Sequence, residues 1–313
     1  MVIGKVEVVF KDNLTVGEGP HYIEEENALV FVDIPAHTVF RYDCNTGSVT
    51  KGVIPDVKEI GFIIPVREER NKFLIGADQT VAILEWDGKD ADNLTVKVVD
   101  SVDELKGNRF NDAKCDRSGR LWLGTMGSEE SPGEVKKHTA ALYSLNSSGS
   151  LEKKLKDVSL SNGLGWSPDD SVFYYVDSVE MRVDAFDFNI KEGTIDNRRT
   201  IFDLPSNGFE SIPDGLTVDV MGNLWVATFF GSKILRIDPQ VGKLIDTVEI
   251  PAKNVTSCTW GGSHYDELYV TTSALCTDLK EYPMGGSLFK VSGLGMKGFP
   301  NVPCNFTTST KTA

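Results

Sequence analysis

The stretch GLTVDVMGNLWVATFFGSKILRIDP, from Gly215 to Pro239, reads as three short β-strands in succession. Its apolar runs are rich in Val, Ile, Leu, Trp and Phe, the residue types that fit a half-buried pleated strand. Turn residues separate the runs, with Gly222 and Asn223 in the first turn and Gly231 and Ser232 in the second. Such residues suit tight hairpins, so the stretch predicts consecutive antiparallel strands.

The same pattern recurs along the whole chain. Clear copies are GLGWSPDDSVFYYVDSVEMRVDAFDFN at 163–189 and NDAKCDRSGRLWLGTM at 111–126, the latter completed after an insertion by AALYSLN at 140–146. Weaker copies begin at Gly17, Gly61 and Val255, and the last of these is completed by GSLFKVSG at 286–293. Equivalent positions recur about every 40–50 residues, which is the length of a four-stranded propeller blade.

The repeat predicts an all-β fold, a six-bladed β-propeller of four-stranded blades that forms a single domain over residues 1–303. The sixth copy is one strand short, and we expect Val6–Phe10 to supply the missing outer strand and close the ring. Closure removes exposed sheet edges. A pair of β-sandwiches is the alternative, and the regular spacing disfavours it. Residues 304–313 match no copy and are expected to form a disordered tail.

Composition narrows the function. The 313-residue chain has a formal net charge of −14, which disfavours nucleic acid as a partner. No apolar run has the length of a membrane span, so we expect no membrane partner. Five cysteines without a CxxC motif argue against a disulfide framework or a zinc-thiolate site and favour a cytoplasmic location. We expect a monomer or weak dimer.

Polar residues begin several of the predicted inner strands. Glu18, Asn111, Asn162 and Asp214 occupy equivalent positions of the repeat, whereas the second copy has an apolar run around Phe62. In a propeller these positions converge on the central channel, and carboxylate and amide oxygens there suit a hard divalent cation. Each residue alone could instead cap its own hairpin. Four equivalent occurrences favour the cation site, since two unpaired carboxylates on one axis would repel each other.

Several ordered motifs together resemble one known family. GEGPHY, RFNDAKCD, SNGLGWS, FYYVDS, PDGLTVD, GNLWVA and DELYVTT are similar to segments of the SMP-30/gluconolactonase/luciferin-regenerating-enzyme family, which includes regucalcin. The resemblance covers essentially the whole chain. It implies a six-bladed propeller with one divalent cation in its channel and hydrolysis of sugar lactones such as gluconolactone.

The resemblance also implies roles for individual residues. Glu18, Asn162 and Asp214 match the metal-binding positions, and Arg109, Asn111 and Glu129 match the substrate-binding positions. The insertion at 127–140 matches a lid over the channel mouth, although a plain surface loop is an equal reading. Together with Phe62 and Phe110, residues 127–139 are expected to form the pocket wall. Asp112 is expected to point away from the channel and to pin the turn of its blade.

The expected function is therefore a divalent-metal-dependent lactonase, a carboxylic ester hydrolase of the gluconolactonase type acting on a small-molecule lactone. The cation, calcium first and zinc, manganese or magnesium as alternatives, would polarise the carbonyl while Asp214 activates water. A direct bond from Asp214 to the cation would weaken it as a base, and the sequence leaves this open. Alternatives are a luciferin-regenerating-enzyme-type hydrolase on the same site and a regucalcin-like calcium-binding regulatory protein.

Overall fold

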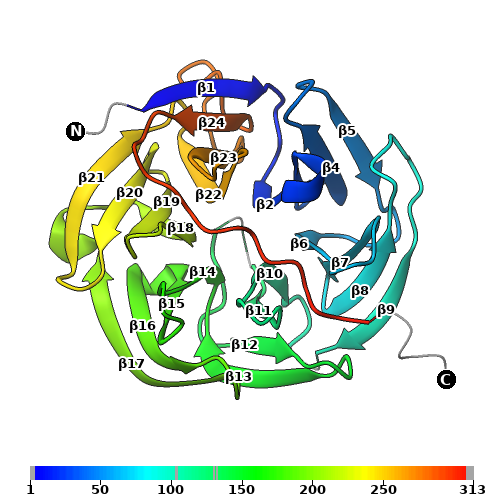
Figure 1. Cartoon of the computed structure of the whole chain (residues 1–313), viewed down its shortest axis with the longest axis horizontal. Helices are drawn as coiled ribbons and strands as arrows, with labels where there is room; N and C mark the ends of the chain where they lie inside the picture. The colour runs from blue at the N-terminus through cyan, green and yellow to red at the C-terminus, as the bar shows by residue number, and fades with distance from the viewer. Residues whose placement is uncertain (1–3, 103–104, 130, 132, 308–313) are drawn as a thin grey trace.

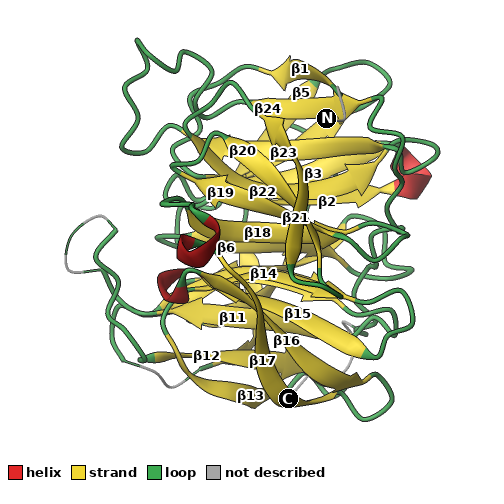
Figure 2. Ribbon diagram, turned by 90° about the vertical axis from the view of Figure 1, so that its left-hand side faces the viewer, coloured by secondary structure: helices red, strands yellow, loops and turns green. Residues whose placement is uncertain are grey.

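The computed structural model describes residues 4–102, 105–129, 131 and 133–307. Within these residues the chain forms six four-stranded antiparallel sheets, arranged as blades around one axis (Figure 1). The predicted six-bladed β-propeller is confirmed. In the side view, loops project from both faces of the ring (Figure 2). None of the helices in the described part of the chain is long and apolar enough to cross a membrane.

In blades 1 to 5 the strands follow the order of the chain from the axis outward. Blade 1 consists of β2 (Gly17–Ile23), β3 (Ala28–Asp33), β4 (Thr38–Asp43) and β5 (Val49–Val53). Blade 2 consists of β6 (Ile60–Pro65), β7 (Lys72–Ala77), β8 (Thr80–Glu85) and β9 (Val96–Ser101). Blade 3 consists of β10 (Arg109–Cys115), β11 (Leu121–Met126), β12 (Ala140–Leu145) and β13 (Leu151–Val158). Blade 4 consists of β14 (Ser161–Trp166), β15 (Val172–Asp177), β16 (Arg182–Asn189) and β17 (Thr194–Asp203).

Two more blades complete the ring. Blade 5 consists of β18 (Ile212–Val218), β19 (Leu224–Phe229), β20 (Lys233–Asp238) and β21 (Lys243–Glu249). Blade 6 consists of β22 (Asn254–Gly261), β23 (Glu267–Ser273), β24 (Leu288–Ser292) and β1 (Lys5–Phe10). Three short 3-10 helices lie in connections among the described residues: η1 (Glu24–Glu26), η2 (Ser178–Glu180) and η3 (Pro205–Asn207).

The N-terminal strand closes the ring, as the short sixth copy of the repeat predicts. β1 pairs antiparallel with β24, in a register that runs from Lys5 opposite Ser292 to Phe10 opposite Leu288. Blade 6 therefore takes its outer strand from one end of the chain and its other three strands from the opposite end (Figure 1). This pairing satisfies the outward backbone groups of β24, which would otherwise form an open edge.

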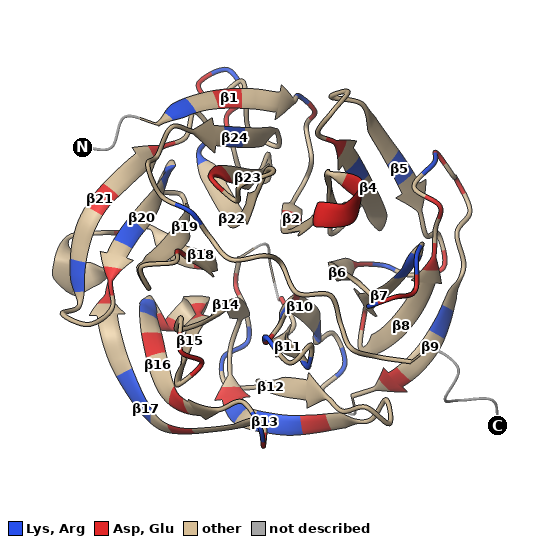
Figure 3. Ribbon diagram, in the orientation of Figure 1, with Lys and Arg blue, Asp and Glu red and all other residues tan. Residues whose placement is uncertain are grey.

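Burial decreases from the axis to the rim. All residues of β14 and β22 are buried, whereas the outer strands β13 and β17 are largely exposed. Charged side chains accordingly gather on outer strands and loops, and the inner strands carry few (Figure 3). The acidic surface and the apolar core thus lie at different radii of the same blades.

An aspartate and a tryptophan stabilise the first hairpin of blades 3 and 5. Asp116 accepts hydrogen bonds from Ser118 N (2.9 Å) and from the indole nitrogen of Trp122 (3.0 Å). In blade 5, Asp219 accepts the equivalent indole bond from Trp225 (3.1 Å). The motif D-x-x-G-x-L-W therefore encodes both the turn and the buried tryptophan of its second strand.

The C-terminal segment 298–306, called the strap below, crosses the ring at its centre (the red trace in Figure 1). The Asn301 side chain donates to Trp260 O (2.9 Å) and accepts from Thr259 Oγ1 (2.7 Å) and Tyr22 N (3.2 Å), so it joins blades 6 and 1. Further along, Cys304 N donates to Pro65 O (2.8 Å) in blade 2. The strap links blades that are far apart in the sequence.

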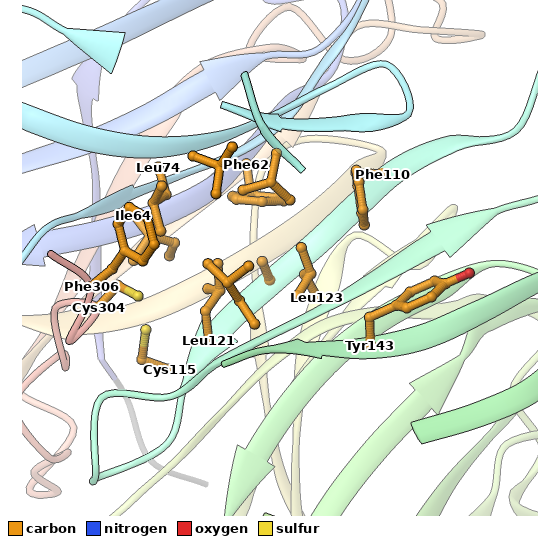
Figure 4. Packing of buried hydrophobic residues seen from close by; sticks show 14 of the residues in the cluster. Phe62, Ile64, Leu74, Phe110, Cys115, Leu121, Leu123, Tyr143, Cys304 and Phe306 are labelled. Carbon is orange, nitrogen blue, oxygen red and sulfur yellow. The ribbon is translucent and has the colours of Figure 1, made fainter. Parts of the chain in front are cut away.

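The expectation of a disordered tail from residue 304 is wrong for its first part. Cys304 and Phe306 are buried in the apolar cluster between blades 2 and 3 (Figure 4). Phe62 and Phe110 belong to the same cluster, where their rings meet edge to face at 6.2 Å. These contacts were not evident from a polar sequence, CNFTTSTKTA, that contains only two apolar residues besides its final alanine. Residues 308–313 lie outside the described residues.

We predict that Phe306→Ala lowers the free energy of unfolding by about 3 kcal/mol, because it empties a buried aromatic site. Urea denaturation followed by circular dichroism measures this change. Met221→Ala, which removes a side chain that is 74% exposed, serves as the control and should change little. A stability equal to that of the wild type would mean that the strap contributes nothing to the fold.

Candidate metal and substrate site

Three polar residues from three blades lie buried near the axis. Glu18 of β2, Asn162 of β14 and Asp214 of β18 are 6%, 4% and 7% exposed. They belong to inner strands that pack against their neighbours around the ring, with β14 in contact with β18 and both β2 and β18 in contact with β22. The three residues predicted to hold a metal thus all lie on inner strands around the axis.

A break in strand pairing presents these residues to the axis. All six inner strands lose regular register with the second strand of their blade, between Glu18 and His21 in blade 1 and between Pro213 and Leu216 in blade 5. Such irregularities re-aim side chains and are common beside active sites. The repeat therefore carries the same local distortion in every blade.

The glycines after Asn162 and Asp214 allow neighbouring inner strands to approach closely. A Cβ atom on Gly163 would lie 2.8 Å from Asp214 O, and one on Gly215 would lie 2.1 Å from Ser257 Oγ. Any larger residue would therefore push the adjacent strand outward. The motifs SNGL and PDGL combine a candidate ligand with the glycine that brings the next blade close to it.

Both carboxylates are buried without a salt-bridge partner among the described residues, which disfavours their charged forms. Burial, together with the nearby charge of Asp112, raises the pKa of Glu18 to about 8. Burial and the charges of Glu18 and Asp112 raise the pKa of Asp214 well above its usual range. Glu18 accepts a 2.7 Å hydrogen bond from Gly19 N, and within the described chain neither carboxylate forms a salt bridge. A bound cation would relieve this repulsion.

The donor set fits a hard divalent cation. Among the described residues, no three His, Cys, Asp or Glu side chains form a metal-binding group. A cation here would consequently need the amide oxygen of Asn162 beside the carboxylates of Glu18 and Asp214. Calcium, magnesium and manganese accept such oxygen donors readily, and zinc accepts them less readily.

A chain of hydrogen bonds orients the amides. Asn162 Nδ2 donates to Ser178 Oγ (2.7 Å), whose hydroxyl donates to Pro213 O (2.6 Å) in blade 5. From blade 3, Asn111 Nδ2 donates to Asn162 Oδ1 (2.9 Å) and to Ser161 O (2.9 Å). With Nδ2 of Asn162 bound to Ser178, its Oδ1 keeps one side available to a ligand at the axis.

Arg109 extends this chain to the rim. Its Nη1 donates to Asn111 Oδ1 (2.7 Å) and Phe110 O (2.9 Å), and its Nε lies 3.2 Å from Glu59 Oε1. Burial lowers the pKa of Arg109, while the charges of Glu59, Glu129 and Glu18 act in the opposite direction. The Nη1 and Nε groups of the guanidinium therefore have partners within the protein. The Nη2 group remains the donor that a substrate oxygen can use.

Glu129 lies near Arg109, but it belongs to a loop, whereas Arg109 belongs to a strand. It is exposed, sits in the loop after β11, and accepts a hydrogen bond from Gly133 N (3.0 Å). Lys136 N donates to Ser128 O (2.9 Å) within the same loop. The predicted lid therefore has internal hydrogen bonds in its described part, and residues 130 and 132 lie outside the described residues.

Two expectations about the channel are wrong. Asp112 does not point away, because β10 loses register between Phe110 and Ala113 and regular alternation ends there. Its charge instead acts on both Glu18 and Asp214. Phe62 and Phe110, expected in the pocket wall, are 0% and 1% exposed and pack in the core between blades.

Sequence reasoning missed Ser178 and Glu59. Ser178 follows the strand that pairs with β14, and Ser161 lies opposite Asp177, so hairpin register could have placed Ser178 beside Asn162. Glu59 comes from blade 2 and reaches Arg109 in blade 3 across a blade boundary. No spacing in the sequence indicates that contact.

We predict that the stability of the metal-free protein falls as pH rises from about 5 to 8. The folded state holds the Glu18 proton up to a pKa of about 8, whereas the unfolded chain releases it near 4.5, so the folded state binds more protons between these values. Stability is lost at about 1.4 kcal/mol per pH unit for each such proton. Urea unfolding with a chelator, at several pH values, measures the slope. Saturating calcium should flatten it, and a flat slope without metal would contradict the charge assignment.

We further predict that Ser178→Ala weakens divalent-cation binding by about 10- to 100-fold, the usual cost of losing a residue that orients a ligand. The change leaves Asn162 Nδ2 without its acceptor and frees the amide to turn. Isothermal titration of chelator-treated protein with calcium or manganese measures the affinity. Exposed Ser147→Ala is the control, and an unchanged affinity of Ser178→Ala would remove the hydroxyl from the site.

Comparison with known proteins places the chain in one family. The model of the SMP-30/Gluconolactonase/LRE-like region matches residues 16–274. Regucalcin of Bos taurus is 39% identical over 302 residues, covering 96% of this chain and 98% of that protein. The solved structure of a luciferin-regenerating enzyme is 35% identical with a TM-score of 0.91, covering 97% and 100% of the two chains. A gluconolactonase of Xanthomonas campestris, 20% identical with a TM-score of 0.70 and covering 92% of this chain and 89% of its own, shares the fold. The chain described here belongs to the SMP-30/gluconolactonase/LRE-like family.

Proposed function

We propose that this protein is a metal-dependent lactonase that hydrolyses small lactones, with sugar lactones of the gluconolactone type as the first candidates. The observation that carries the proposal is that oxygen ligands for a cation and a hydrogen-bond donor for a substrate occur close to the axis. Glu18, Asn162 and Asp214 offer oxygen ligands, and Arg109 presents a hydrogen-bond donor beside them. Family membership and the structural likeness to a gluconolactonase of Xanthomonas campestris support the same chemistry.

A divalent cation held by Glu18, Asn162 and Asp214 would polarise the lactone carbonyl and lower the pKa of water. Calcium is the first candidate, and zinc, manganese and magnesium are the alternatives. Asp214 is the general base that takes the proton of the attacking water. Its carboxylate has two oxygens, each of which can accept a proton or bind a cation. One oxygen can therefore serve as a ligand while the other accepts the proton.

Arg109, Asn111 and Glu129 bind the substrate. Arg109 donates to ring or carbonyl oxygens, and its links to Glu59 and Asn111 keep it from turning toward solvent. Asn111 has both amide hydrogens engaged with Ser161 O and Asn162 Oδ1, so only its Oδ1 has capacity left for a substrate hydroxyl. The carboxylate of Glu129 accepts hydroxyl donors from the loop side.

Two other functions use the same residues. A luciferin-regenerating-enzyme-type hydrolase is favoured by the structural likeness to the enzyme of that name. Its ligands would be identical, so the substrate panel must separate the two. A regucalcin-like calcium-binding regulatory role needs the oxygen ligands but leaves the half-buried Arg109–Glu59 ion pair without a purpose. We therefore rank hydrolysis above regulation by binding alone.

We predict that Asp214→Asn lowers kcat/KM for a susceptible lactone by at least about 100-fold, because it removes the general base. Hydrolysis of a panel of sugar and alkyl lactones is measured after chelation and again with added calcium, zinc, manganese or magnesium. Asp87→Asn, in an exposed turn of blade 2, is the control. Near-normal turnover by Asp214→Asn would refute the mechanism. Absence of turnover with every metal would leave only the binding function.

A further inference from the structure

A small cavity lies beside the candidate ligands, since its lining includes Gly19, which follows Glu18. It has a volume of about 20 Å³, enough for one water molecule. Its lining is Gly19, Pro20, His21, Ile64, Asp112, Ala113, Lys114, Ser257 and Cys258. Two of these side chains carry opposite charges, the carboxylate of Asp112 and the ammonium of Lys114.

Asp112 is a third carboxylate close to the cation site. Its Oδ1 accepts a 2.7 Å hydrogen bond from Ala113 N, and this is a local contact. Its charge acts on Glu18 and on Asp214, raising the pKa of both. Asp112 is not one of the proposed direct ligands, and among the described residues no three His, Cys, Asp or Glu side chains form a metal-binding group.

Lys114 spans from blade 3 to blade 5 past blade 4. Its Nζ donates to Leu216 O (2.8 Å), two residues after Asp214 on the same strand. Burial lowers the pKa of Lys114, and the neighbouring carboxylate of Asp112 opposes this shift. A buried ammonium is costly unless a negative group compensates it, so the two side chains depend on each other.

When all three carboxylates are ionised, the charges of this group balance with a divalent cation present. Without the cation, protons on Glu18 and Asp214 take its place, because the pKa of both is raised. Glu18, Asp112 and Asp214 contribute three negative charges, which a divalent cation and the ammonium of Lys114 neutralise. The charge of Arg109 is not part of this sum, because its guanidinium pairs with the carboxylate of Glu59. Removing Lys114 or Asp112 would shift this balance in opposite directions without touching a direct ligand.

We propose that Asp112 and Lys114 form a charge pair beside the cation site that sets how tightly the protein holds its divalent cation. Asp112 is a positioning carboxylate that strengthens cation binding, and Lys114 limits that effect while holding the strand of Asp214 in place. The inference rests on the proposed function for its cation site, not on the identity of the substrate. A purely structural Asp112, engaged only with Ala113 N, would not produce opposite effects in the two variants.

The test compares Asp112→Asn, Lys114→Gln and the double variant. Glutamine keeps a donor for Leu216 O and removes the charge, and Lys114→Met serves as a second variant if the glutamine form does not fold. Calcium and manganese affinities of chelator-treated protein are measured by isothermal titration, with Asp87→Asn as the control. Thermal unfolding of each metal-free variant verifies that it is folded.

We expect Asp112→Asn to weaken cation binding by about tenfold or more and Lys114→Gln to strengthen it, because like and unlike charges near the cation act with opposite signs. The double variant should return to within about threefold of the wild type, at the same net charge. Weaker binding in both single variants, or an unchanged affinity in Asp112→Asn, would overturn the charge pair. If the affinities follow the expected pattern but the wild type hydrolyses no lactone, the proposed function fails and this inference stands.

Discussion

The close approach of the six inner strands around the axis is the constraint on which the rest of the structure depends. Gly163 and Gly215 leave room for the neighbouring strand, and each inner strand loses register at the same place. The same narrow spacing that excludes larger side chains brings Glu18 and Asp214 together. The close packing at the centre of the ring therefore also assembles the candidate site.

That arrangement carries an electrostatic cost. Glu18 and Asp214 are buried and Asp112 is half-buried, and desolvation is the largest cause of the raised pKa of each. A fold selected only for stability would place apolar residues there, as blade 2 does with Ile60, Gly61 and Phe62. Proteins retain such unfavourable clusters where binding of a ligand offsets the lost stability. This is a common compromise between stability and function.

Local patterns in the sequence predicted most of the fold and indicated the candidate ligands. The hairpin motif with its Asp–Trp bond is contained in D-x-x-G-x-L-W, and the ring closure by β1 followed from counting strands in the last repeat. Glu18, Asn162 and Asp214 became candidate ligands because the repeat places them in equivalent positions, and their role stays a prediction. Asp112 was misassigned because the strand alternation used for it ends at the irregularity between Phe110 and Ala113.

The sequence by itself determined the number of blades, the order of the strands and which positions meet at the axis, because each of these depends on patterns within about 50 residues. Only the tertiary structure decided the contacts between blades. Glu59 meets Arg109, Ser178 orients Asn162, Lys114 reaches Leu216, and the strap buries Phe306. In three of these four the partners come from different blades or from the strap, where closure of the ring brings together groups that local periodicity does not relate.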